Sequence, residues 1–125
     1  MLGTVETFSS FAVDDLDEAR QFYADTLGVK VSAGPMGVLS LDLAGGRTIL
    51  VYPKPDFTPA TYTILNFIVD DVVEAVDGLT ERGVKFERYE GLDQDAKGIS
   101  RNPGGPQIAW FKDPAGNILA VLQTS

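Results

Sequence analysis

The sequence predicts an α+β fold made of two similar βαβββ modules, and a repeat within the chain is the main reason. The segment FAVDDLDEA at 11–19 recurs as FIVDDVVEA at 67–75, with six of the nine residues identical. A second match, GVKV at 28–31 against GVKF at 83–86, follows at nearly the same spacing. In each copy a strand-like pattern passes into a helix-like one. Two similar halves imply a pseudo-symmetric fold with a cavity where they meet, and the residues that line this cavity decide the function.

The first half begins with a strand that leads into a capped helix. Residues 5–13 are rich in β-branched and aromatic types, which is typical of a strand. Asp15 stands at the N-cap position of the helix, and Glu18 completes a capping-box pattern. An apolar stripe at helical spacing follows and ends at Gly28. The second half repeats these features at 61–69, Asp71, Glu74 and Gly83.

Three strand-like segments follow each helix and complete the βαβββ order. They lie at 30–33, 38–43 and 47–52 in the first half, and at 85–89, 107–112 and 117–122 in the second. The prolines between the halves indicate an extended linker. We therefore expect a single domain over 1–125, with module one at about 4–52, a linker at 53–60 and module two at about 61–123.

The segment 91–106 differs from the rest of the chain, because it is rich in Gly and Pro and has no periodicity. It is long for a plain connection within a compact domain, and such loops are often lids or binding loops. Two interpretations remain open. The segment is either a lid over a binding site or an ordinary mobile surface loop.

The composition excludes several classes of function. A formal net charge of −8 argues against nucleic acid, because phosphate binding needs clustered Lys and Arg, and it favours neutral or cationic ligands. No apolar run approaches the roughly 20 residues that a membrane-spanning helix needs. The N-terminus has no signal-peptide pattern, which predicts a cytoplasmic protein. The chain has no Cys, so disulfides and thiol chemistry are excluded.

The order of these elements, with a V-x-D sequence at each helix entry, resembles the vicinal oxygen chelate superfamily, which is the glyoxalase, bleomycin-resistance and extradiol-dioxygenase group. Phe22-Tyr23 followed by Leu27-Gly28 matches its F-Y-x-x-x-L-G element, and the sequence DPAGN at 113–117 matches its D-P-x-G-N turn. The resemblance covers about 5–123. It implies a glyoxalase-like fold in which the strands of both modules form a curled mixed sheet around a central cup.

In metal-using members of this family, four strands each supply one His, Glu or Gln ligand to a divalent cation. The resemblance places these positions at Phe8, Leu50, Ile64 and Ala120. None of these side chains has a donor atom, and the chain contains no His at all. We therefore predict no metal and no cofactor, and classical metal-dependent glyoxalase or dioxygenase activity is not expected.

Without a metal, the cup is expected to be an apolar binding site with a few directed polar groups. By strand alternation and by the resemblance, we predict these ligand-binding residues: Phe8, Ser10, Leu50, Tyr52, Ile64, Asn66, Arg101, Trp110, Ala120 and Leu122. Glu6 is the one carboxylate that alternation places near the cup, and it is the candidate for a catalytic residue, with a loop residue such as Arg101 as the alternative. The other interpretation is that these side chains simply fill the cup as core.

Three functions are therefore open. The first is a small-molecule-binding protein of the bleomycin-resistance type, a homodimer that sequesters an apolar or cationic compound. The second is a metal-independent lyase or isomerase that uses a carboxylate in the cup. The third is a regulatory or structural dimer whose cup is filled. The sequence favours the first, with a small organic molecule as the partner and neither nucleic acid nor membrane.

Overall fold

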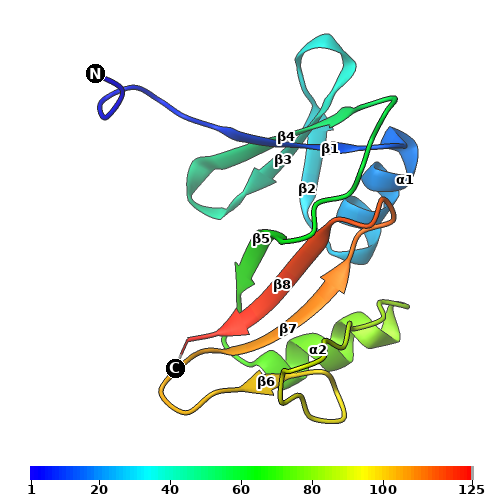
Figure 1. The fold of residues 1–125 in the computed structure, drawn as a ribbon. Helices are drawn as coiled ribbons and strands as arrows, with labels where there is room; N and C mark the ends of the chain where they lie inside the picture. Colours follow the sequence, from blue (N-terminus) through cyan, green and yellow to red (C-terminus); the bar gives the residue numbers. More distant parts are fainter. Residues whose placement is uncertain (125) are drawn as a thin grey trace. The chain divides into compact units, whose positions relative to one another are not determined.

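The computed structural model describes residues 1–124, which form two compact units, one from Met1 to Thr58 and one from Pro59 onward. Each unit contains a four-stranded mixed sheet with helical structure beside it. The sheets share one topology, with strand order β1-β4-β3-β2 in the first unit and β5-β8-β7-β6 in the second (Figure 1). The expected α+β fold of two similar modules is therefore confirmed.

In the first unit β1 runs parallel to β4, and the other neighbouring strands are antiparallel. The elements are β1 (Ser9–Val13), α1 (Leu16–Gln21), a π-helical turn (Phe22–Thr26), β2 (Lys30–Ala33), β3 (Leu39–Leu43) and β4 (Arg47–Pro53). The expected single helix thus has two parts, because its backbone hydrogen bonds change from α-helical to π-helical spacing after Gln21. Gly28 ends it as predicted, with a φ of 71° that a residue with a side chain rarely adopts.

The core of the first unit lies between this helical segment and one face of the sheet. Tyr23 is fully buried, and its ring centroid lies 5.8 Å from that of Phe11 and 5.3 Å from that of Phe22. The sheet contributes four buried side chains to the same core: Val13, Leu39, Leu41 and Val51. The opposite face of this sheet carries no helix of its own unit.

The second unit repeats this arrangement, with β5 parallel to β8. Its elements are β5 (Thr63–Ile68), α2 (Val72–Glu81), β6 (Ser100–Arg101), β7 (Gln107–Lys112) and β8 (Ile118–Gln123). Helix α2 packs on β7 and β8. The core between helix and sheet consists of these buried side chains: Val72, Val76, Ala109, Phe111, Leu119 and Val121.

Both predicted helix caps form. The Asp15 carboxylate accepts hydrogen bonds from the backbone N–H groups of Asp17 at 2.9 Å and Glu18 at 3.2 Å, and Asp71 accepts one from Glu74 at 3.1 Å. The capping box is only half formed, because within residues 1–124 neither glutamate side chain returns a hydrogen bond to its aspartate. A single accepting carboxylate already pairs some of the backbone N–H groups that have no partner within the first turn of the helix.

The first strand is shorter than predicted. Pairing with β4 begins at Ser9, opposite Ile49, whereas the sequence pattern suggested a strand from Val5. Every side chain from Met1 to Ser10 is exposed, and Figure 1 shows the N-terminal segment extending away from β1. Residues before Ser9 therefore gain no ladder hydrogen bonds from β4, and their apolar composition alone does not make them a strand.

The predicted strand at 85–89 is wrong, because the edge of β7 with which it would pair is divided between two segments. Phe86 forms a single bridge with Phe111, and the Glu87 N–H donates to the Trp110 carbonyl at 2.8 Å. Further along β7, the short strand β6 takes over the edge, with Ser100 opposite Ile108. One edge strand is thus split in two, with residues 88–99 inserted between its halves.

Candidate functional site

Each sheet has one face that carries no helix of its own unit, and most of the predicted ligand-binding residues lie on these two faces. On the first sheet, Ser10, Leu50 and Ser40 stand side by side on β1, β4 and β3. Tyr52, two residues beyond Leu50, lies on the same face beside Ala12. We call this surface face one. Face one brings together the predicted residues Ser10, Leu50 and Tyr52.

A carboxylate on face one was missed by the sequence reasoning. Asp42 accepts hydrogen bonds from the hydroxyl groups of Ser32 at 2.8 Å and Ser40 at 3.1 Å. Ser40 is buried and Asp42 is half-buried, so the carboxylate is held in place by its neighbours. The pattern LSLDL at 39–43 contains the signal, because its polar residues alternate with leucines on a strand.

On the second sheet, Asn66, Ala120 and Trp110 stand side by side on β5, β8 and β7. The next row of the same face holds Ile68, Leu122 and Ile108. We call this surface face two, and it carries four of the predicted residues: Asn66, Trp110, Ala120 and Leu122.

The edge of face two is built by residues 87–89, at the start of the inserted loop. The Tyr89 ring packs edge-on against Trp110, with centroids 5.6 Å apart and an interplanar angle of 80°. Lys112 forms an ion pair with Glu87 at 3.5 Å. Burial, and to a smaller extent the charge of Glu87, raises the pKa of the Tyr89 phenol above its usual range. The Tyr89 hydroxyl oxygen is buried and has no hydrogen-bond partner within residues 1–124.

The remaining predicted residues lie elsewhere. Phe8 and Glu6 belong to the exposed segment before β1. Ile64 lies at a β-bulge, where the register shifts between Thr63 and Leu65, so simple alternation does not assign its face. Arg101 pairs with Gln107, which lies on the same face of β7 as the core residues Ala109 and Phe111 and not on the face of Trp110.

The Arg101 guanidinium is already engaged by its neighbours. It forms an ion pair with Asp95 at 3.3 Å and donates to the Gln107 side-chain oxygen. Burial alone would raise the pKa of the Asp95 carboxyl, but the backbone N–H groups of Ile99 and Lys97 and the Arg101 side chain lower it below its usual range. Arg101 therefore helps to hold the inserted loop.

The four family-implied metal positions do not fit a divalent cation. Phe8, Leu50, Ile64 and Ala120 have hydrocarbon side chains, which supply no electron pair to a metal. Within residues 1–124, no three His, Cys, Asp or Glu side chains are grouped so that they could hold a metal ion.

No helix in the described part of the chain is both long enough and apolar enough to cross a membrane.

Residues 5–121 match the family model described as Glyoxalase/Bleomycin resistance protein/Dioxygenase superfamily. No curated protein matches the sequence. Among solved structures, the chain is similar to TnmS3, an antibiotic binding protein from Streptomyces sp. CB03234, with 25% identity over 98% of each chain and a TM-score of 0.71.

Two further solved structures share the fold. One is a superfamily member from Sphaerobacter thermophilus, with 24% identity over 95% of this chain and 98% of that chain and a TM-score of 0.71. The other is the fosfomycin resistance protein FosX from Listeria monocytogenes, with 17% identity over 98% of this chain and 94% of that chain and a TM-score of 0.71.

Proposed function

The chain belongs to the Glyoxalase/Bleomycin resistance protein/Dioxygenase superfamily, and from this premise we propose that it binds and sequesters a small apolar or cationic compound without using a metal. In this proposal the protein is a cytoplasmic homodimer, and binding alone is its function. The likeness to an antibiotic binding protein supports a binding role over a catalytic one.

The observation that carries the proposal is the chemistry of face two. An indole ring, Trp110, stands in a row with Asn66 and is flanked by a row of three aliphatic side chains that includes Ile68 and Leu122. Ile68 is 73% exposed, so this row presents apolar surface to water. Mostly apolar surfaces with a few directed polar groups are typical of small-molecule sites.

Face one supports a preference for a cationic ligand. Asp42 is a fixed carboxylate two residues along β3 from Ser40, which stands opposite Leu50, so an apolar contact and a negative charge are available on the same face. The overall charge of −8 also attracts cations and repels anions. A ligand with an aromatic or aliphatic body and an ammonium group has both complementary features.

Intrinsic fluorescence tests the proposal directly, because Trp110 is the only tryptophan of the chain. The protein is treated with a chelator and titrated with cationic aromatic compounds and with neutral compounds of the same shape. We expect saturable quenching that does not need added Mn²⁺, Ni²⁺ or Zn²⁺, and tighter binding of the cationic compounds. Binding that appears only with a metal, or conversion of the ligand detected by mass spectrometry, would contradict the proposal.

Replacement of the face-one carboxylate tests the preference for cations. Asp42→Asn keeps one oxygen that can accept from one serine hydroxyl, and its amide group can donate to the other, but the charge is removed. A cationic ligand should therefore bind about 3- to 10-fold more weakly, as expected for the loss of one charge-assisted interaction. Asp93→Asn, at an exposed position in the inserted loop, is the matched control and should leave the affinity unchanged.

A further inference from the structure

The second unit contains a groove of about 400 Å³ that lies between α2 and the two segments that join α2 to β6. Phe86 lines this groove, and its ring packs 5.6 Å from the core residue Phe111. Trp110 and Tyr89, in contrast, pack together at face two. Phe86 and Arg88 therefore lie on one side of this segment, and Glu87 and Tyr89 lie on the other. The groove opens on the first side, which is the helix side of the sheet. It is separate from face two.

The floor of the groove is apolar. Val76 on α2 and Val84 after the helix are both buried, and the half-buried Phe86 ring lies between the groove and the core. Because the two valines are already buried, it is mainly the Phe86 ring that a hydrocarbon or aromatic group would shield further from water, at about 25 cal/mol for each Å². The floor therefore favours a ligand with an apolar body.

The rim of the groove is positive in a protein that is otherwise strongly negative. Lys85, Arg88 and Lys97 line it, against a single carboxylate, Asp77. These are three of the ten Lys and Arg residues in a chain with eighteen Asp and Glu. Such a concentration of positive charge is a local exception to the overall field.

Two of these positive side chains, Lys85 and Arg88, have N–H groups that are available to bind a ligand. Within residues 1–124 the Lys85 ammonium has no hydrogen-bond or ion-pair partner. Arg88 uses only one nitrogen, Nη2, which donates to the carbonyl oxygens of Asp95 at 2.7 Å and Ala96 at 2.9 Å. Its other N–H groups remain available. Lys97, in contrast, is paired with Asp77 across the groove.

The outer wall of the groove, at 96–98, is held firmly. The Gln94 side chain accepts from the Tyr89 N–H at 2.8 Å and donates to the carbonyl oxygens of Glu87 at 3.0 Å and Gly98 at 2.8 Å. Asp95 accepts from the N–H groups that follow it, and Ile99 is fully buried. A wall fixed in this way needs little ordering when a ligand binds.

We propose that this groove is a second ligand site, which binds a small amphiphilic anion: an apolar ring or branched chain over Val76, Val84 and Phe86, with a carboxylate or sulfonate facing Lys85 and Arg88. The site lies within the second unit and does not depend on the function proposed for the sheet faces. Its ligand preference is the reverse of theirs, because a cation would meet the three positive side chains of the rim.

The experiment uses three probes of one shape: naphthoate, the neutral naphthamide and the cationic naphthylmethylammonium. Each is titrated into the full-length protein by calorimetry, and the site is located by amide chemical shifts in nuclear magnetic resonance. We expect naphthoate to bind most tightly, to shift the amides of Thr80, Val84 and Gly98, and to bind more weakly as salt increases. Equal affinity for the three probes, or naphthoate shifts confined to the sheet faces, would overturn the proposal.

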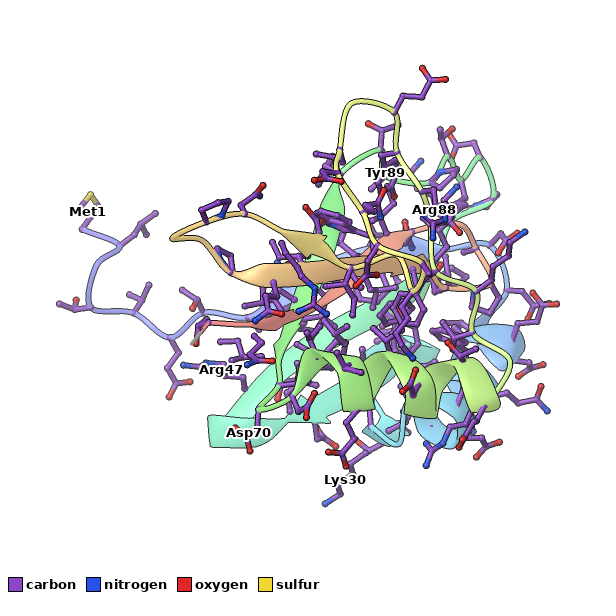
Figure 2. All side chains as sticks on the ribbon, turned by 90° about the horizontal axis from the view of Figure 1, so that it is seen from below. Met1, Lys30, Arg47, Asp70, Arg88 and Tyr89 are labelled. Carbon is purple, nitrogen blue, oxygen red and sulfur yellow. The ribbon has the colours of Figure 1, made fainter. Side chains whose placement is uncertain are left out.

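Three variants separate the groove from a general charge effect. Lys85→Gln should weaken naphthoate binding about 3- to 10-fold, as one charge-assisted contact is lost. Thr80→Phe leaves the charge unchanged but fills the groove, and it should abolish binding. Lys30→Gln removes the same charge from an exposed lysine that points away from the protein (Figure 2), and it should have no effect.

A fourth variant is expected to gain affinity, which damage to the fold would not produce. Asp77→Asn removes the only carboxylate of the rim and releases the Lys97 ammonium from its ion pair. Naphthoate should then bind about 2- to 5-fold more tightly, a change of the size expected for an exposed charge. Unchanged or weaker binding by this folded variant would contradict the proposed role of the positive rim.

Discussion

The Tyr89 hydroxyl is buried at the edge of face two and has no hydrogen-bond partner in the part of the chain that the structure describes. A buried hydroxyl of this kind carries a desolvation cost that its ring packing must offset. Tyr89→Phe keeps the ring against Trp110 and removes only the oxygen. We expect the free energy of unfolding to stay unchanged or to rise by up to about 1 kcal/mol in urea denaturation. Tyr62→Phe, at an exposed position, is the control. A loss of stability in Tyr89→Phe alone would show that the hydroxyl has a partner.

Asp95 is the central acceptor of the inserted loop, with the N–H groups of Lys97 at 2.9 Å and Ile99 at 3.0 Å and the Arg101 guanidinium at 3.3 Å. Its pKa is lowered in the folded protein, so the stability that it contributes is present above the unfolded pKa of about 4 and is lost as pH falls through the lower folded value. Asp95→Asn should therefore lower the melting temperature at pH 7 by several degrees and flatten the acid side of the stability curve below about pH 4. Parallel curves for the variant and the natural protein would contradict this role.

Single residues also show what the sequence could predict. The two N-cap aspartates were predictable because the cap and the helix that it serves are adjacent in the chain. Asp42 carries a local signal too, but a single polar residue in a strand does not reveal whether a partner will hold it. The engagement of Arg101 by Asp95 depends on how the loop folds back on β6. Spacing along the chain does not contain that information.

At the scale of elements, β7 explains why the strand prediction at 85–89 failed. The residues alternate as a strand should, and Phe86 and Glu87 do reach the edge of β7. A strand, however, needs a length of free edge, and part of this edge is taken by Ser100 and Arg101. Competition for one partner strand is a property of the whole sheet, so the pattern of either segment alone does not show it. The same competition accounts for the short β6 within a segment that has no periodicity.

The first turn of helix α2 is stabilised by a hydrogen bond to a residue outside the helix. The Val72 N–H is fully buried at the first turn and donates to the side-chain oxygen of Gln123, at the end of β8, at 3.0 Å. Gln123→Met keeps the side-chain length but leaves this N–H unpaired, which should cost about 1–3 kcal/mol in denaturant unfolding. Gln21→Met, at an exposed position on α1, is the matched control and should change stability by less than about 0.5 kcal/mol. Equal effects of the two changes would show that the contact to Gln123 does not stabilise the helix.

At the scale of the whole molecule, the internal repeat predicted the fold because each copy specifies its own strands, cap and helix. The two sheets have the same strand order, although the copies differ at most positions. The helix-free faces followed from strand alternation once the strands were known. The central cup depends on how the modules dock, which no repeat or period encodes, and it stays a prediction.

The expected homodimer can be tested from the apolar side chains that the described chain leaves in water. Ile68, on face two at the end of the edge strand β5, is 73% exposed, and it stands in a row with Leu122 and Ile108, so the apolar surface is a patch and not one isolated residue. If a second copy covers it, the protein elutes at about twice its chain mass of 13.4 kDa, and its melting temperature rises with protein concentration. Ile68→Lys should shift the protein toward the monomer in light scattering and remove this concentration dependence. Met36→Lys is the matched control, because Met36 is fully exposed at the tip of a turn, where one apolar side chain has no sheet surface around it. A monomer at all concentrations, or equal behaviour of the two variants, would contradict the dimer.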